Sequence, residues 1–199
     1  REQLTSNRAQ AHALLLDDLL AGRHNSPGTV ADRARELDLE LPSHPNLLVV
    51  EPTGVGRSLT DDTVESLVLA LGLAPPDRTT PSTQRSHLCT RREQRAILLL
   101  PSAIGRAHVD VASRATGVHG CLVERSTIAG VGSAWRLASE ALDTAPDHAF
   151  EDRAVLDSGD GQLLALLTAR PTADTSEVVR TVLGSLTEAA NAHILEGLS

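Results

Sequence analysis

The sequence predicts an α/β fold, an α+β sandwich in which a small mixed sheet with a central β-hairpin is flanked by helices. Short, continuous apolar runs alternate with longer segments in which apolar residues recur every three or four positions. Gly- and Pro-rich turns separate them. The 199 residues are 41% hydrophobic but only 1% aromatic, so we expect a core of Leu, Val, Ile and Ala. Helices packed on a sheet accommodate such a core well.

Two amphipathic helices are expected before the first strand. Ala11, Leu15 and Leu19 recur at intervals of four residues, and Gly22 fits a C-cap. The Ser-Pro pair at 26–27 fits an N-cap followed by proline at the first helical position. These helices form the helical N-terminal extension of the fold.

A strand buried on both faces is expected at 47–50, where Leu-Leu-Val-Val lies between two prolines. A turn with Gly54 and Gly56 follows, and Thr60 with two acidic residues begins a helix. The segment 72–86 contains three prolines and is expected to be a loop.

A hairpin is expected over 87–101, with a short strand at 87–89, a charged turn at 91–94 and a second strand at 96–100. The remaining expected elements are a helix at 104–115, a strand at 117–123, a helix at 133–145 and a short helix at 163–167, which Asp160 would cap. A heptad-like apolar seam, 179–193, predicts a helical C-terminal segment.

These elements suggest three parts. Residues 1–42 are expected to be a helical linker or dimerisation segment, 43–170 the α/β domain, and 171–199 a C-terminal helical segment. The chain begins with Arg and contains no Met, which is typical of a fragment of a longer protein.

The charge argues against several function classes. All 18 basic residues are Arg, and 26 acidic residues give a net charge of −8, which opposes binding to a phosphate backbone over a broad face. No apolar run is long enough to span a membrane, and no signal peptide is recognisable. Cys89 and Cys121 are too few for a disulfide scaffold, so we expect a reducing cytoplasm and two core thiols.

No strong catalytic pattern is present. The turn at 51–58 partly resembles a phosphate-binding loop in sequence. However, Glu51 and Arg57 occupy the positions where that motif needs Gly and Lys, which favours an ordinary strand-to-helix turn. The eight histidines do not form a metal-binding pair, and neither cysteine has a second one at short spacing. Arg91, Arg92 and Arg95 form a basic cluster that could receive an acidic ligand or a partner's carboxylates, although a solvated turn is the commoner outcome.

Segment 88–101 resembles the strand-turn-strand of GGDEF domains, the diguanylate cyclases, and Glu51 resembles the end of their metal-binding segment. The pattern is more similar to the degenerate GGDEF-like domain of bacterial transcriptional regulators of the PucR/CdaR type. Blocks similar to that branch occur in the same order along nearly the whole chain, at 15–22, 31–41, 129–142 and 183–186.

The departures from the cyclase pattern bear directly on activity. Cyclases resemble one another in a Gly-Gly-Asp/Glu-Glu-Phe turn, whose glycines let the backbone approach phosphates and whose acid helps to hold a metal. The corresponding positions here are Arg91, Arg92, Glu93, Gln94 and Arg95, and the upstream Arg-x-x-Asp motif reads Ser-Thr-Gln-Arg at 82–85. The resemblance therefore implies a domain that is not an enzyme, with no catalytic, cofactor-binding or metal-binding residues.

The resemblance implies a regulatory domain that couples an upstream signal or small-molecule effector to a DNA-binding helix-turn-helix. Segment 194–198 is similar to the start of the helix that leads into that module, so DNA would be bound outside this chain. We expect a cytoplasmic homodimer, formed through Leu15 and Leu19 or through the seam at 179–193, although both stripes could equally pack on their own domain.

Two other functions stay open. One is a metal-dependent nucleotide cyclase or phosphodiester hydrolase with residual activity, in which Glu51 and Glu93 share a cation. The other is a small-molecule sensor with a pocket between the sheet and the helices. Trp135 lies off the apolar stripe of its expected helix, so its fluorescence could report such a ligand.

Overall fold

The computed structural model describes residues 2–23, 27–37, 39, 41–54, 56–73, 87–161 and 163. Its helices are α1 (Glu2–Leu20), α2 (Pro27–Glu36), α3 (Asp61–Ala70), α4 (Arg106–Thr116) and α5 (Val131–Thr144), with short 3₁₀ helices η2 (Ile128–Gly130) and η3 (Asp147–Phe150). Its strands are β1 (Asn46–Pro52), β2 (Leu88–Arg92), β3 (Arg95–Leu100), β4 (Val118–Val123) and β5 (Val155–Asp157). The predicted α/β class is confirmed.

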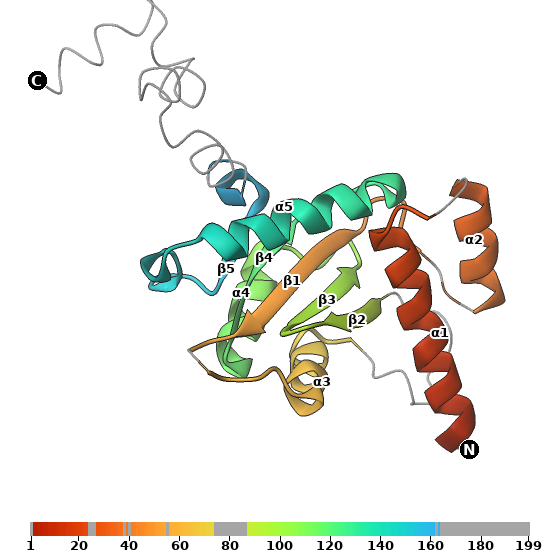
Figure 1. The fold of residues 1–199 in the computed structure, drawn as a ribbon, viewed down its shortest axis with the longest axis horizontal. Helices are drawn as coiled ribbons and strands as arrows, with labels where there is room; N and C mark the ends of the chain where they lie inside the picture. The colour runs from red at the N-terminus through yellow and green to blue at the C-terminus, as the bar shows by residue number, and fades with distance from the viewer. Residues whose placement is uncertain are drawn as a thin grey trace, which may run out of the picture.

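The five strands form one mixed sheet in the order β2-β3-β1-β4-β5 (Figure 1). β1 is antiparallel to both of its neighbours, β3 and β4, whereas β4 and β5 are parallel. The first four strands and helices α3 and α4 therefore form two interlocked split β-α-β units. The hairpin β2-β3 lies at an edge and not at the centre, because the helical crossovers bring β1 between β3 and β4. The expectation of a central hairpin was wrong in this respect.

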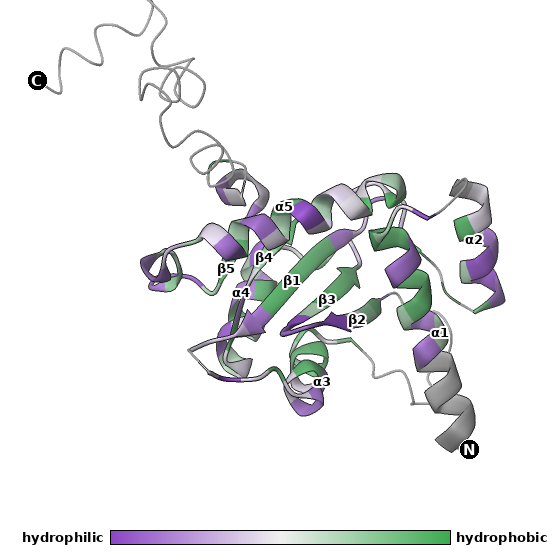
Figure 2. Ribbon diagram, viewed as in Figure 1, coloured by the Kyte–Doolittle hydropathy of each residue, from purple (hydrophilic) through white to green (hydrophobic). Residues whose placement is uncertain are grey.

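β1 is buried on both faces, as its continuous apolar sequence predicts. Leu47 and Val49 join a core with α1, α2 and α5, while Leu48 and Val50 join a second core with α3 and α4. The molecule thus has three layers, with helices on each face of the sheet (Figure 1). The strands carry the hydrophobic colour along their middles, and the hairpin end of the sheet is polar (Figure 2).

The predicted helix ends are confirmed at two positions. Gly22 has a φ of +67°, and the amides at 22 and 23 bond back to Leu19 and Asp18 as in a Schellman cap of α1. Thr60 caps α3, because its Oγ1 accepts a hydrogen bond of 3.2 Å from the Thr63 amide.

β5 is an element that the sequence analysis did not predict. Its three residues are held at the sheet edge by Asp110, whose Oδ1 accepts from the amides of Ala154 and Val155. The helical turn that follows β5 is capped by Asp157 and not by Asp160, the residue predicted as the cap. Asp157 Oδ1 accepts from two following amides, while Asp160 Oδ2 accepts from the Asp157 amide in return, as in a capping box.

Several predicted features lie outside the described residues. They are most of the loop at 72–86, most of the short helix at 163–167, the seam at 179–193 and the segment 194–198. Within the described ranges, no helix combines the length and apolar character that crossing a membrane requires.

Candidate functional site at the hairpin end of the sheet

Three polar side chains lie side by side on neighbouring strands where β1 ends. His119 on β4 is the direct cross-strand partner of Glu51. Arg95 begins β3 one position beyond the Val50–Ala96 pair, so it lies opposite Glu51 on the other side. Since neighbouring positions in register share a face of a sheet, the three side chains point the same way, toward α5. They are only about one-fifth exposed, at 21% for Arg95, 22% for Glu51 and 18% for His119.

The carboxylate of Glu51 is bonded on both oxygens. Arg95 donates Nε to Glu51 Oε2 at 2.8 Å, and His119 Nε2 lies 2.9 Å from Glu51 Oε1. Arg95 also donates to Asp143 Oδ1 of α5 at 2.7 Å, and the His119 ring stacks on Phe150 with centroids 4.3 Å apart. This cluster therefore ties β1, β3 and β4 to α5 and η3.

These contacts set the ionisation of the pair. Burial by itself would raise the pKa of Glu51, but the hydrogen bonds and charges of His119 and Arg95 hold that pKa below its ordinary value. For Arg95 the signs are reversed. Burial by itself would lower the pKa of Arg95, but the hydrogen bonds and charges of Asp143 and Glu51 raise that pKa above its ordinary value. Glu51 and Arg95 therefore form a fixed ion pair, in which each carboxylate oxygen of Glu51 already accepts one hydrogen bond.

The bend of the hairpin lies two residues later than the sequence analysis placed the glycine-equivalent positions. Arg92 pairs with Arg95 across the turn, so only Glu93 and Gln94 form it. Arg91 and Arg92 belong to β2, and Glu93 carries the positive φ, +55°, that such tight hairpins require at a central residue. The guanidinium groups thus extend from the strand next to the bend and not from the bend itself.

Each of the three clustered arginines binds a carboxylate on a different element. Arg91 donates to Asp61 at the start of α3 and to the carbonyl of Leu59. Arg92 donates to Asp17 of α1. Together with Arg95 they bind carboxylates of this chain, although Arg91 and the two residues of the bend remain exposed, as a solvated turn implies. Local sequence could not show these pairings, because the partners are 30 to 75 residues away.

The structure does not bring Glu51 and Glu93 into a shared cation site. Glu51 is bound by Arg95 and His119, whereas Glu93 is an exposed residue of the turn. Throughout the described part of the chain, no group of three or more His, Cys, Asp or Glu side chains is arranged to hold a metal ion.

Cys121 is a buried core residue, as expected, whereas Cys89 is partly buried and packs against the core shared with α3 and α4. Burial raises the pKa of the Cys89 and Cys121 thiols to about 12.

Trp135 is partly buried and packs against the core shared with α1 and α5. The guanidinium of Arg92 lies over its ring, with Arg92 Cζ 4.6 Å from the ring centroid. It is therefore less exposed than its position off the apolar stripe suggested.

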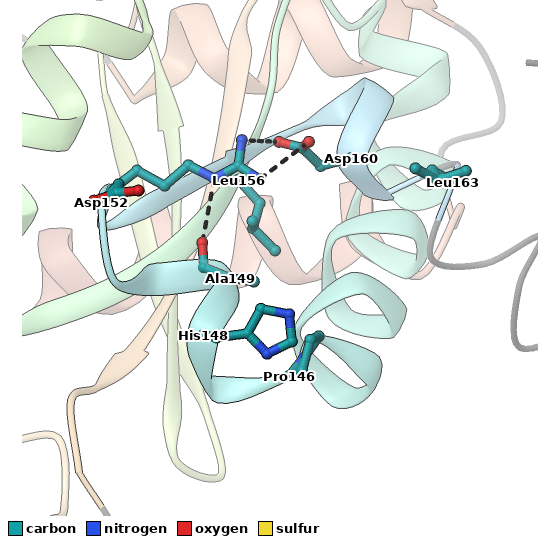
Figure 3. A pocket seen from close by; sticks show the side chains of 8 residues that line it. Pro146, His148, Ala149, Asp152, Leu156, Asp160 and Leu163 are labelled. Carbon is teal, nitrogen blue, oxygen red and sulfur yellow. Dashed lines mark hydrogen bonds and ion pairs between the residues drawn. The ribbon is translucent and has the colours of Figure 1, made fainter. Parts of the chain in front are cut away.

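A separate cavity of about 540 Å³ lies beside η3 and β5 (Figure 3). Its lining is mostly apolar and includes Pro146, Leu156 and Leu163, with His148 at the side and Asp152 at the rim. Arg153 spans one edge, where it donates to both carboxylate oxygens of Asp160, at 2.7 and 3.2 Å, and to the carbonyl of Ala149. Apart from Asp160, which was expected as a helix cap, these residues were not predicted from the sequence, because η3 and β5 were not predicted.

Searches of protein-family models and of curated proteins find no match to this chain.

Proposed function

We propose that this chain is a non-catalytic regulatory and dimerisation domain of a bacterial transcriptional regulator of the PucR/CdaR type. It would couple an upstream signal or a small-molecule effector to a DNA-binding domain outside the chain. The observation that carries the proposal is the occupation of Glu51 by Arg95 and His119. The diguanylate cyclases that this chain resembles need a carboxylate at this end of β1 to hold their metal. In this chain the corresponding carboxylate is part of a structural ion pair.

The topology supports the same assignment. The β-α-β-β-α-β order, with a hairpin beside the end of β1, is the arrangement that the resemblance to GGDEF-like domains implies. The bend carries Glu93 and Gln94 where close approach of a phosphate would favour glycine. Such a bend suits a retained scaffold whose nucleotide chemistry has been lost.

The first experiment addresses catalysis. The purified chain, incubated with GTP or ATP and with Mg²⁺ or Mn²⁺, is expected to form no cyclic nucleotide above a protein-free blank, by liquid chromatography and mass spectrometry. Glu51→Gln is the matched control. Product that appears with the natural chain and disappears with Glu51→Gln would establish the metal-dependent alternative instead.

The second experiment addresses self-association. Leu15 and Leu19 are 1% and 0% exposed in the core of their own domain, so acidic substitutions there would unfold the chain rather than separate subunits. Leu14 is 54% exposed on the same helix and offers a cleaner probe. Fused to a DNA-binding domain that represses only as a dimer, the chain is expected to repress a reporter. Failure to repress, with a monomeric mass in light scattering, would contradict dimerisation, and Leu14→Asp tests whether α1 contributes.

The cavity beside β5 supports the effector part of the proposal. Its size, about 540 Å³, lies within the range of small-molecule sites, and an apolar floor with a few polar groups is the usual composition of such sites. Purines, allantoin-like compounds and sugar acids form a first ligand panel. A ligand of this cavity is expected to raise the thermal unfolding temperature of the natural chain but not of His148→Ala, whereas an equal rise in both would place the ligand elsewhere.

A further inference from the structure

Arg92 connects two helices that come from different parts of the chain. Its Nε and Nη2 donate to Asp17 Oδ1 of α1 at 3.2 and 3.1 Å. On the other side, its Cζ lies 4.6 Å from the centroid of the Trp135 ring on α5, the distance of a cation–π contact. One guanidinium at the end of β2 therefore binds α1 and α5 at the same time.

The two contacts depend on one another through the shape of the side chain. A guanidinium is planar and rigid, so its orientation toward a carboxylate also fixes its orientation toward an aromatic ring. Asp17 Oδ1 also accepts a third hydrogen bond, from Thr90 Oγ1 at 3.4 Å, which helps to hold the carboxylate in place. A change in the position of Asp17 must therefore turn or displace the group that covers Trp135.

The movement available to α1 is a shift within its site. Leu15, Leu16, Leu19 and Leu20 are at most 4% exposed, so their burial keeps the helix on the domain. The ion pair between Arg92 and Asp17 is less confined than these leucines, because its side chains are 31% and 32% exposed. Helix shifts of about 1–2 Å are a common form of signal transmission between packed elements.

We propose that Arg92 is a relay through which small shifts of α1 are transmitted to α5. The inference rests on the proposed regulatory function, since it makes α1 the input helix and the hairpin the connection to α5. α5 is the helix that Arg95 ties to the end of β1 through Asp143, so the relay reaches the candidate site described above.

The fluorescence of Trp135 provides the first test, because it is the single Trp of the chain. Asp17→Asn removes the charge that orients Arg92, and it is expected to shift the emission maximum of Trp135 and change its quenching by acrylamide. Asp18→Asn is the matched control. Asp18 is the next residue of α1, but it pairs with Arg33 and Arg23 rather than with the hairpin, so Trp135 fluorescence should stay as in the natural chain. Equal emission and quenching in the two variants would overturn the proposal.

A double-mutant cycle tests whether the coupling passes through Arg92. A direct route also exists, because Gly132 of α5 lies so close to the end of α1 that a Cβ there would be 2.9 Å from the carbonyl oxygen of Leu20. Asp17→Asn and Trp135→Leu, alone and together, are compared by urea unfolding followed with circular dichroism. Their effects on the unfolding constant should depart from a simple product by about threefold or more.

The same cycle is then measured in an Arg92→Met background, where the two effects should multiply. A departure that survives in Arg92→Met would assign the coupling to the direct helix contact and overturn the relay. Should Asp17→Asn prevent folding, Arg92→Lys serves instead, since it keeps a charge for Asp17 but loses the flat group over Trp135.

These measurements report on one folded chain and need no partner or DNA. Coupling that is present in a chain failing the reporter assay would retain the relay and reject the regulatory assignment. A chain that represses normally but shows no coupling would retain the regulatory assignment and reject the relay.

Discussion

Arg95 binds Glu51 across neighbouring strands, Nε to Oε2 at 2.8 Å, at the one end of the sheet where a cyclase-like domain would need a free carboxylate. The pair is about four-fifths buried and is extended by His119 on one side and Asp143 on the other. An ion pair with this much hydrogen bonding is costly to break by removing one partner, since the remaining charge is left partly desolvated. Loss of one member of the cluster should therefore destabilise the fold.

Arg95→Met is expected to lower the free energy of unfolding by about 1.5–3 kcal/mol, the usual value of a lost hydrogen bond to a charged group. Glu51 then keeps only His119 as a partner. Urea unfolding at neutral pH measures the change. Arg35→Met is the control, because Arg35 and its partner Asp32 are 74% and 67% exposed, and an exposed pair contributes about 0.5 kcal/mol or less. Equal losses in the two variants would contradict the structural role of Arg95.

The sequence predicted most elements because their signals are local. The buried run at 47–50, the caps at Gly22 and Thr60 and the amphipathic pattern of α5 each depend on residues a few positions apart. β5 was missed because three residues at a sheet edge carry almost no periodicity, and Asp110 holds them from 44 residues away.

The candidate site was only partly predictable for a related reason. Glu51 was singled out because the end of its strand resembles the metal-binding segment of GGDEF domains, but its partners Arg95 and His119 lie 44 and 68 residues further along the chain. Only the strand order places them on either side of it, and local patterns do not specify strand order. Asp143 could not be linked to the hairpin until the face covered by α5 was known.

The pH dependence of stability should reflect His87. Burial, and secondly the charge of His12, lower the pKa of His87 from 6.5 to about 4. The unfolded chain therefore takes up this proton near pH 6.5 and the folded chain only near pH 4, so folding stability is lost as the pH falls through this interval. The loss should approach about 3 kcal/mol in all, at about 1.4 kcal/mol for each unit of pKa difference.

Chemical unfolding between pH 7.5 and 4 measures this effect. His87→Gln removes the titrating group and should flatten the profile over that interval, whereas His108→Gln, at an exposed position of α4, should leave it steep. Glu51 acts at lower pH, because its folded pKa lies below 4.5. A natural chain whose stability is constant from pH 6.5 to 4.5 would contradict the burial of a neutral His87.

Gly120 allows β1 and β4 to approach each other closely. A Cβ at this position would lie 2.4 Å from the backbone oxygen of Val49 and 2.8 Å from Val50 Cγ1, contacts that no side chain can tolerate. Gly120→Ala must therefore displace a central strand, and it should destabilise the fold by about 2–3 kcal/mol. Gly105→Ala is the comparison, because its added methyl would meet only Glu124 Oε1, at 3.7 Å. Thermal unfolding of the two variants should differ clearly, and similar midpoints would show that the sheet accommodates the methyl group.

The bend of the hairpin offers the opposite kind of variant, one that stabilises. Glu93 holds a φ of +55°, which costs an ordinary residue about 1–2 kcal/mol, whereas glycine adopts it freely. Part of this gain is offset by the greater freedom of glycine in the unfolded chain, so Glu93→Gly should raise the free energy of unfolding by about 0.5–1 kcal/mol.

Gln94→Gly is the matched control, because Gln94 has no positive φ and should lose about 0.5–1 kcal/mol on substitution. Urea unfolding separates the two outcomes by their sign, and a loss in both would contradict the bend as described. Even with a glycine in the bend, the Glu93→Gly chain is expected to form no cyclic nucleotide, because Arg95 and His119 still bind both oxygens of Glu51. Turnover by this variant would show instead that the bend, and not the ion pair at the end of β1, is what prevents catalysis.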